Sequence, residues 1–432
     1  MSVSEMFKNF LDNLKVDTAE QIALRYGEIT RSLNQQFRET GSTTANSLQV
    51  GSYGRYTGVK GISDLDMLYI MPTGKWDYYK DGKQFKLLTD IKDAIKARYP
   101  KTAVRADRLV VTVSYSNFHV EVQPVFESTD EDGNSYFQYP DTYDGGKWKV
   151  TKPRQEMQAI KALNEQKNKN LRLLCKMARA WKNRSGVAMG GLLIDTLAYN
   201  FLNSTEAYDT KSYQYFGEMS RDFFEYLANE PDKDHYKAPG SNQNVNVKKK
   251  FQKKAKKAYE ACLKAIEAGS DAGAYTRWKK IYGRHFPGAP IVFAEAKSEQ
   301  AWRDTEEFIE DFYPVDIRSS VTIDCSVYQS QGLPKSLLTM LAKGFGISNN
   351  RQLIFEIKEH DVAGSFRVKW KVLNRGPVAR KRDCIRGQIE PFNYGENSRK
   401  ESASFKGDHI VECYILQNDV VIARDSIKVP IL

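Results

Sequence analysis

The spacing of apolar residues predicts both helices and strands in the first two thirds of the chain, and mainly strands in the last third. Apolar residues recur at helical intervals from Met6 to Leu14, and again from Ile22 to Phe37 after the capping pair Asp17-Thr18. We expect these two amphipathic helices to brace a sheet. Further helical patterns cover residues 87–99, 171–182, 191–202, 223–227 and 248–268. The third of these is almost wholly apolar, which predicts a buried helix.

Alternation of apolar and polar residues predicts strands in two parts of the chain. In the first part, strands are predicted at residues 47–50, 64–70, 109–113 and 118–126. The segment 130–152 has no period, and we expect a long loop or a hairpin there. Near the C-terminus, short strands separated by turn residues predict a small β-sandwich, with strands at 321–325, 352–357, 366–372, 409–415 and 420–423.

These patterns predict an α+β fold class with several domains. We place a sheet-containing lobe with the N-terminal helices at residues 1–170 and a helical second lobe at 171–285. A linker follows at 286–303, and a β-rich domain occupies 304–432. A chain of 432 residues is long enough to bury more than one hydrophobic core.

Composition limits the partners and the location of the protein. A net charge of +11 and a pI near 9.1 favour an anionic partner, either nucleotides or a nucleic acid. The five cysteines are scattered without a Cys-x-x-Cys pair, which argues against a disulfide framework or a zinc site. Neither a signal peptide nor a membrane span is evident, so we expect a cytoplasmic protein without a membrane partner. The lysines from Lys248 to Lys257 form either a solvated helix face or a strip that follows nucleic-acid phosphates.

The strand predicted at 64–70 carries the strongest chemical signal. Asp64 and Asp66 are two residues apart, so their side chains point to one face of the strand, while the opposite face is apolar. Two neighbouring carboxylates repel each other, and a shared divalent cation removes the repulsion; oxygen ligands favour Mg²⁺. Upstream, Gly51 and Ser52 form a turn whose backbone N–H groups and hydroxyl can bind a polyphosphate that the same metal bridges. Together these features predict nucleotidyl transfer.

A third acid is expected on a neighbouring strand, because a two-metal site needs a further ligand. Glu121 lies between two valines and shares a strand face with His119 and Gln123. We therefore predict that Asp64, Asp66 and Glu121 are the catalytic residues and metal ligands, with Mg²⁺, or alternatively Mn²⁺, as the metal. The other interpretation of Glu121 is an exposed strand residue without a catalytic role.

The pattern Gly-Ser-x-Gly-Arg-x-Thr followed by Asp-x-Asp resembles the active-site signature of the polymerase-beta-like nucleotidyltransferase superfamily. The resemblance implies a polymerase-beta-like sheet in the first lobe. Relatives carry an aspartate where this chain has Glu121, which is one methylene longer. With the helical lobe that follows, the part before the linker is similar to cGAS/DncV-like nucleotidyltransferases (CD-NTases) of the SMODS type. These enzymes make cyclic or linear oligonucleotide second messengers in anti-phage (CBASS) signalling.

Three segments near the C-terminus resemble the adenylyl/guanylyl-cyclase and SMODS C-terminal sensor domain (AGS-C). They are Asn374-Arg375-Gly376, Ile385–Ile389 and Phe405–Tyr414. The resemblance implies a module that senses a nucleotide or another signal, and a packing or oligomerisation role is the alternative. Several basic residues cluster in a turn region of this domain and can bind phosphate: Arg375, Arg380, Lys381, Arg382 and Arg386.

The resemblance to CD-NTases implies further substrate-binding residues. Lys176 corresponds to a lysine that contacts the donor triphosphate, which Gly51 and Ser52 also bind. Ser241 and Asn242 lie where relatives contact a nucleobase. The resemblance also implies nucleoside triphosphates as substrates (ATP or GTP, with pyrimidine nucleotides as an alternative) and a separate effector protein that reads the product.

We therefore expect a Mg²⁺-dependent nucleotidyltransferase that joins nucleoside triphosphates into a cyclic or linear oligonucleotide and releases pyrophosphate. One alternative keeps the chemistry but transfers the nucleotide to RNA or to a protein, and the run of lysines favours it slightly. A second alternative is an inactive nucleotide sensor, which the presence of all three acids and the serine disfavours. An activating ligand or a nucleic acid at the basic surfaces is a further expected partner.

Overall fold

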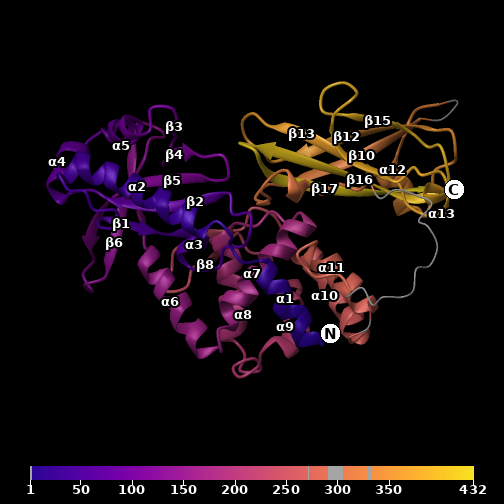
Figure 1. Cartoon of the computed structure of the whole chain (residues 1–432), viewed down its shortest axis with the longest axis horizontal. Coiled ribbons are helices and arrows are strands. Elements are labelled where there is room, and N and C mark those ends of the chain that lie inside the picture. The colour runs from indigo at the N-terminus through magenta and orange to yellow at the C-terminus, as the bar shows by residue number, and fades with distance from the viewer. Residues whose placement is uncertain (1, 271, 290–304, 329–331) are drawn as a thin grey trace. The chain divides into compact units, whose positions relative to one another are not determined.

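The computed structural model of the chain describes residues 2–270, 272–289, 305–328 and 332–432 (Figure 1). The chain divides into two compact units, one formed by Met1–Trp181 and Gly190–Gly288 and the other by Lys182–Met189 and Ala289–Leu432. From residue 290 onward, the linker predicted at 286–303 lies outside the described residues. The first unit combines a mixed sheet with helices, and the second is built mainly of antiparallel strands, which confirms the predicted α+β class.

The first unit contains a mixed sheet. Its strands are β1 (Ser47–Gln49), β2 (Asp64–Ile70), β3 (Ala103–Ala106), β4 (Val111–Ser114), β5 (His119–Thr129), β6 (Ser135–Asp141) and β7 (Lys147–Thr151). The order is β1-β2-β5-β4-β3, with β6 beside β5 and β7 beside β6. Strands β2 and β5 run parallel, whereas the other neighbours are antiparallel. The aperiodic segment 130–152 is therefore largely a hairpin, formed by β6 and β7.

Alternation along β2 decides which face of this sheet is buried. Leu65, Met67 and Tyr69 point into one core together with apolar residues of two helices, α2 (Ala19–Arg38) and α5 (Gln84–Arg98). Helix α2 therefore braces the sheet, as its pattern predicts. The intervening carboxylates of the strand face the other way. Short helical turns connect these elements: α3 (Gly51–Gly54), the 3-10 turn η1 (Thr73–Lys75) and α4 (Trp76–Tyr79).

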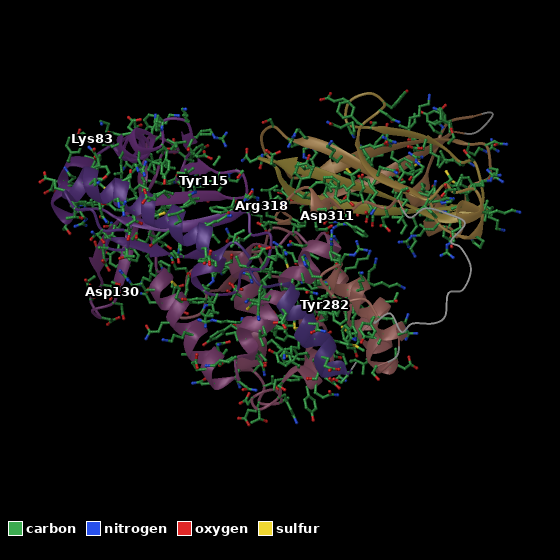
Figure 2. The ribbon with its side chains drawn as sticks, in the orientation of Figure 1. Lys83, Tyr115, Asp130, Tyr282, Asp311 and Arg318 are labelled. Carbon is green, nitrogen blue, oxygen red and sulfur yellow. The ribbon has the colours of Figure 1, made fainter. Side chains whose placement is uncertain are left out.

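The rest of the first unit is mainly helical. Its elements are α1 (Val3–Asn13), α6 (Pro153–Gln166), α7 (Asn170–Ser185), α8 (Gly191–Asn203), η2 (Tyr213–Tyr215), α9 (Phe216–Asn229), β8 (His235–Lys237), β9 (Asn244–Asn246), α10 (Gln252–Glu267) and α11 (Ala272–Tyr282). Tyr282 is fully buried among these helices, where its hydroxyl donates to Ser220 Oγ at 2.6 Å (Figure 2). Helix α10 begins four residues later than predicted, and its lysines are exposed.

The prediction that α1 braces the sheet is wrong. Its apolar face carries Phe7, whose ring meets Trp278 edge-on at 5.0 Å and Phe286 at 5.5 Å. Phe10 of the same helix packs against Tyr282 at 4.8 Å. Helix α1 therefore belongs to the aromatic core of the helical part, where each aromatic pair contributes ~0.5–1.5 kcal/mol beyond the burial of its area.

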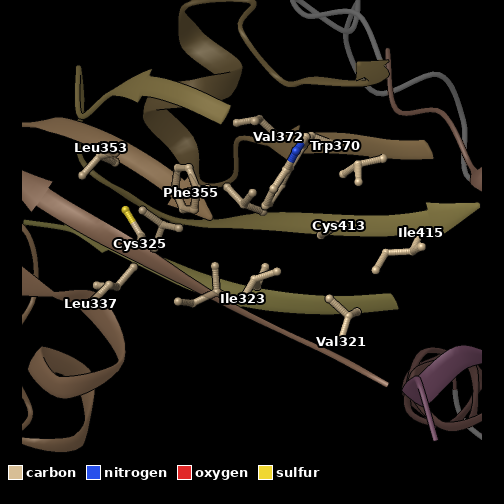
Figure 3. Close-up of a cluster of buried hydrophobic side chains, with 14 of the residues drawn as sticks. Val321, Ile323, Cys325, Leu337, Leu353, Phe355, Trp370, Val372, Cys413 and Ile415 are labelled. Atoms are coloured by element: carbon tan, nitrogen blue, oxygen red, sulfur yellow. The ribbon is translucent and has the colours of Figure 1, made fainter. Parts of the chain in front are cut away.

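The second unit is a β-sandwich, as predicted. Its elements are η3 (Ile309–Asp311), β10 (Val321–Tyr328), β11 (Lys335–Ser336), α12 (Leu337–Ala342), β12 (Gln352–His360), β13 (Arg367–Leu373), α13 (Pro377–Lys381), β14 (Arg386–Pro391), β15 (Arg399–Ser402), β16 (Gly407–Gln417) and β17 (Val420–Ile431). One sheet has the order β11-β10-β12-β15 and another has the order β14-β13-β16-β17. Their inner faces share one core, in which Phe355 and Trp370 are the largest side chains (Figure 3).

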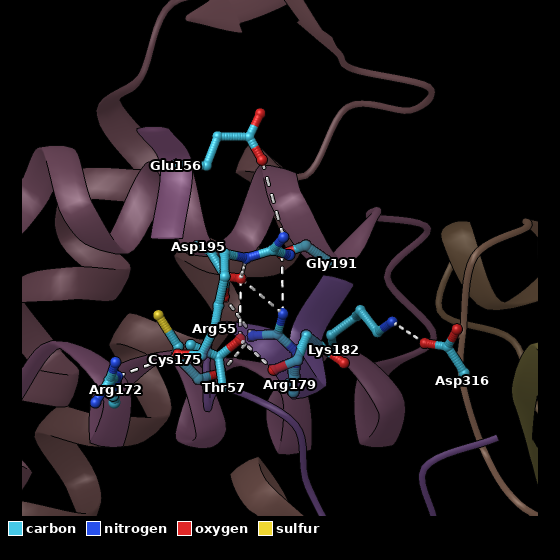
Figure 4. Close-up of polar contacts among 11 residues, drawn as sticks. Arg55, Thr57, Glu156, Arg172, Cys175, Arg179, Lys182, Gly191, Asp195 and Asp316 are labelled. Atoms are coloured by element: carbon cyan, nitrogen blue, oxygen red, sulfur yellow. Dashed lines mark hydrogen bonds and ion pairs between the residues drawn. The ribbon is translucent and has the colours of Figure 1, made fainter. Parts of the chain in front are cut away.

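The second unit also includes the last turn of α7. Lys182 Nζ forms an ion pair with Asp316 Oδ1 at 2.5 Å (Figure 4), and Asn183 Nδ2 donates to the carbonyl oxygen of Val315 at 2.7 Å. The Lys182 side chain is only 3% exposed. A segment far away in sequence thus completes the packing of the C-terminal sandwich.

Two expectations from composition can be compared with the structure. All five cysteines are free thiols, which agrees with the expected lack of a disulfide framework. Among the helices in the described ranges, none has both the length and the apolar character needed to cross a membrane.

Candidate active site

Strands β2 and β5 bring the three predicted acids to one face of the sheet. In their parallel register, Asp66 lies opposite Glu121, and Asp64 lies opposite His119. Neighbouring parallel strands are about 4.8 Å apart, so Asp66 and Glu121 project side by side. All three acids are partly buried, whereas the alternating residues Leu65 and Val120 are in the core. The predicted common face is therefore confirmed, and the catalytic role of the acids remains a prediction.

The glycine-serine turn lies directly against Asp66. The N–H of Val50 donates to the backbone carbonyl of Asp66 at 2.9 Å, which ties the start of the turn to β2. Gly51 has a φ of +64°. A Cβ added at Gly51 would come within 1.8 Å of Asp66 Oδ2. Only glycine adopts this positive φ without strain and also lacks the Cβ that would collide with Asp66, so the backbone can approach the carboxylate.

This contact predicts a strong effect of Gly51→Ala on activity. The added methyl must displace the Asp66 carboxylate, and misplacement of a reacting group by about 1 Å costs roughly 10²-fold in rate. We expect kcat/KM for nucleoside triphosphates to fall at least ~10²-fold, as measured by release of pyrophosphate.

Gly61→Ala is the matched control for this variant. Gly61 also has a positive φ, +77°, but no atom lies within 4 Å of its added Cβ. Both variants therefore carry a similar backbone strain of ~1 kcal/mol, and only one disturbs Asp66. Equal losses of activity in the two variants would show that strain alone, and not the contact with Asp66, is responsible.

A network of buried charged residues holds Arg55 and Thr57, which directly follow the same turn (Figure 4). Asp195 of α8 is fully buried and accepts from Arg55 Nε at 2.8 Å and from Arg179 Nη1 at 2.5 Å. The hydroxyl of Thr57 donates to the same carboxylate at 3.0 Å. Burial by itself would raise the pKa of Asp195, but the charges of Arg179 and Arg55 outweigh it and lower the pKa to about 2. The network therefore joins the residues after Gly51–Gly54 to α7 and α8.

Sequence reasoning missed Asp195, although a signal was present. It is the one carboxylate within the almost wholly apolar stretch 191–202. A charge in a buried helix is very costly unless it is paired, so such a residue predicts cationic partners elsewhere in the chain. The pattern does not identify them, because Arg55 and Arg179 are separated from Asp195 by 140 and 16 residues.

Lys176 lies on the face of α7 that contacts this turn. Arg172, Lys176 and Arg179 are spaced i, i+4 and i+7, which places them on one side of the helix. Arg172 Nε donates to the carbonyl oxygen of Arg55 at 3.1 Å, and Arg179 is linked to Arg55 because both donate to Asp195. Partial burial lowers the pKa of Lys176, and the positive charges of Lys15, Arg172 and Arg179 lower it further. Such a concentration of cations favours an anionic ligand.

The predicted nucleobase residues lie in the loop between β8 and β9. Ser241 is buried, and its hydroxyl donates to Glu156 Oε1 at 3.1 Å. Burial raises the pKa of Glu156, against the opposing effects of Arg55, 4.0 Å away, and of Ser241. Asn242 is exposed and has a φ of +55°. The Ser241 hydroxyl thus fixes the loop to α6, and the nucleobase role of both residues remains a prediction.

The three acids fit a magnesium site by their chemistry. Carboxylate oxygens are the ligands that Mg²⁺ prefers, and they lie on one face of adjacent strands. However, within the part of the chain that the structure describes, no group of three or more His, Cys, Asp and Glu side chains is arranged to hold a metal ion.

A glycine-serine turn packed against an Asp-x-Asp strand, with a third acid on the parallel neighbour, defines the class: a polymerase-beta-like nucleotidyltransferase. Comparison with protein-family models identifies the family within this class. Residues 1–164 match the Second Messenger Oligonucleotide or Dinucleotide Synthetase domain (SMODS), and residues 303–432 match the Adenylyl/Guanylyl and SMODS C-terminal sensor domain. The chain therefore combines a SMODS domain with an AGS-C domain, which confirms its predicted place among the SMODS-type CD-NTases.

Several solved structures are similar to this chain. Escherichia coli MS115-1 CdnC, in its complex with HORMA-deltaN, has 17% identity and a TM-score of 0.49 over 66% of this chain and 98% of that chain. Vibrio cholerae DncV cyclic AMP-GMP synthase, with a linear intermediate, has 16% identity and a TM-score of 0.45 over 66% and 87%. Bradyrhizobium diazoefficiens CdnG, with GTP, has 10% identity and a TM-score of 0.48 over 65% and 95%. No curated protein matches the chain. The family assignment rests on the two domain matches.

Proposed function

We propose that this protein joins nucleoside triphosphates into a cyclic or linear oligonucleotide second messenger, with release of pyrophosphate, in anti-phage defence. The main support is the contact between the Gly51 turn and Asp66, with Glu121 in register on the adjacent strand. This arrangement supports a role for the turn in binding the donor phosphates, next to acids that would hold a metal. The SMODS match supports the same product class.

The residues have distinct roles in this proposal. Asp64, Asp66 and Glu121 would hold Mg²⁺, and Ser52 with the Gly51 backbone and Lys176 would bind the β- and γ-phosphates of the donor. When bound, Mg²⁺ would supply Lewis-acid chemistry, both for an acceptor ribose hydroxyl and for the charge on the leaving pyrophosphate. The Arg55–Asp195 network keeps the turn in place, so that the α-phosphate is held in line with the acceptor. A second transfer in the same pocket would close a ring.

Mass spectrometry of the products of the purified full-length protein tests this proposal. The protein is incubated with all four nucleoside triphosphates and Mg²⁺, and the products are treated with phosphatase. A small phosphatase-resistant oligonucleotide is the expected result for a cyclic product, and a phosphatase-sensitive oligonucleotide is expected for a linear one. Label transferred to RNA or to the protein itself would instead establish the alternative acceptor, and the absence of any transfer would contradict the proposal.

The lowered pKa of Lys176 predicts a distinctive pH dependence. The alkaline limb of kcat/KM reports groups of the free enzyme that must stay protonated. Because burial and nearby cations lower the pKa of Lys176, its charge is lost at a lower pH than that of an ordinary lysine. We expect kcat/KM for the donor nucleotide to fall correspondingly early as pH rises. Loss of a charged phosphate contact in Lys176→Met should reduce kcat/KM ~10-fold to 100-fold and remove this limb.

Lys161→Met on α6 is the control for this measurement, since Lys161 is exposed. Its pH profile should match that of the unmodified protein. An alkaline limb that persists unchanged in Lys176→Met would show that another group titrates.

A further inference from the structure

A cavity of about 560 Å³ lies within the C-terminal sandwich, in the second unit. Its floor is apolar and comes from the inner faces of both sheets: Leu353, Phe355, Val372, Val411, Val429 and Ile431. The segments around α13, β14 and β15 form its rim, and this rim carries polar and charged side chains. A simple packing fault between two sheets would be lined by apolar side chains alone, so this cavity has the composition of a binding site.

The rim has an excess of positive charge. Arg382 and Lys400 are exposed, whereas Arg386 is partly buried. The lining acid, Glu401, is already neutralised: its oxygens accept from Arg386 at 2.6 and 3.0 Å and from Arg399 Nε at 2.8 Å. Burial opposes ionisation of Glu401, but these arginines outweigh it and lower its pKa. The carboxylate therefore holds Arg386 in place at the cavity and leaves Arg382 and Lys400 to attract an anion.

An aromatic ring is fixed beside these cations. The guanidinium of Arg382 lies over the ring of Phe405 at 5.3 Å, and His409 meets the same ring edge-on at 5.1 Å. The buried His409 accepts at Nδ1 from the Arg375 N–H at 3.1 Å, so Nε2 carries the proton and donates to the Phe405 carbonyl oxygen at 3.2 Å. Burial lowers the pKa of His409, which keeps this neutral form. The histidine thus positions Phe405 at the rim.

We propose that this cavity binds a nucleoside phosphate, with the base on the apolar floor and the phosphate at Arg382 and Lys400. The volume lies within the range of small-molecule sites, ~300–1,000 Å³. Phe355 and Phe405 contribute aromatic rings to the lining, beside which a planar base can pack, and Asn374 contributes a polar side chain. Arginine forks match phosphate geometry. The proposal does not depend on nucleotidyl transfer, because every lining residue belongs to the second unit.

Calorimetric titration tests this site directly. The full-length protein carrying Asp64→Ala and Asp66→Ala is titrated without divalent metal, so that turnover and metal-dependent binding at the acids do not contribute. The ligands are the four nucleoside 5′-monophosphates, the corresponding nucleosides and inorganic phosphate. At least one monophosphate should saturate a single site, with a Kd at least tenfold below those of its nucleoside and of phosphate, a difference of ~1.4 kcal/mol. Failure of all four to saturate, or equal binding of nucleoside or phosphate alone, would overturn the proposal.

Substitution of exposed residues then locates the site without endangering the fold. Adding Arg382→Ala and Lys400→Ala should weaken monophosphate binding at least ~10-fold, because two phosphate contacts are lost. The matched control is Lys406→Ala with Lys428→Ala, which removes two exposed positive charges of the second unit that lie outside the lining. The control should bind as the parent does. Equal affinity in the two double variants would refute this location.

Discussion

Replacing both Asp64 and Asp66 with alanine will abolish pyrophosphate release from nucleoside triphosphates in the presence of Mg²⁺. Phosphoryl transfer leaves the protein little to do beyond positioning and charge stabilisation, so loss of the metal ligands removes most of the catalysis. We expect turnover to fall at least ~10⁴-fold, since both activation of the acceptor and stabilisation of the leaving group are lost. The measurement is a coupled assay for pyrophosphate.

The chain offers a matched control for this variant. Asp232 and Asp234 form another Asp-x-Asp pair, but both residues are exposed and precede the short strand β8. Alanine at both control positions also removes two negative charges and should leave turnover unchanged. Turnover that persists without Asp64 and Asp66 would end the account of catalysis given above. The comparison also shows why an Asp-x-Asp pattern needs its strand and its glycine turn to indicate a site.

Asp195→Ala will strongly destabilise the first unit. The substitution leaves Arg55 and Arg179 buried at 6% exposure each without their carboxylate partner. Breaking a buried ion pair by removing one partner costs ~3–5 kcal/mol. We expect a loss of this size in the urea unfolding transition, with hydrogen exchange locating it to α7 and α8. Asp17→Ala, which breaks the exposed pair with Lys60, should change stability by no more than ~1 kcal/mol.

The charge network around Asp195 leads us to expect that the stability of the first unit falls at acidic pH. Because the pKa of Asp195 is lowered to about 2, its ionised form contributes stability above the ordinary aspartate pKa of ~3.9. That contribution is lost as pH falls from about 4 towards 2. The Asp195→Asn variant should lack this part of the acid dependence. An identical acid unfolding curve in the variant would show that the carboxylate is not stabilised as described.

The end of α7 affects how the C-terminal sandwich should be studied. Removal of the chain after Gly288 would take away Asp316 and the Val315 carbonyl, the partners of Lys182 and Asn183. Lys182 and Asn183 would then lose these partners, so a truncated protein combines loss of the sandwich with a change at the end of the helix that carries Lys176. Single substitutions in the cavity avoid this difficulty.

The sequence by itself determined the local features of this protein. Alternation along residues 64–70 specified which side of the strand carries Asp64 and Asp66, because side-chain direction in a strand follows from the backbone. The spacing of Gly51 and Ser52 before this strand predicted the turn, and short alternating segments predicted the sandwich. In each case the information lies within a few neighbouring residues.

Only the tertiary structure decided which elements meet. The pattern of α1 shows an apolar face but not its partner, and that face packs with the helices instead of the sheet. Asp195 is paired with Arg55, which lies 140 residues away in the sequence. The last turn of α7 packs with the second unit. The cavity in the second unit is lined by residues from several separate strands. Amphipathic periodicity encodes that a surface must be buried; the choice of partner depends on shape and charge across the whole fold, which no local pattern contains.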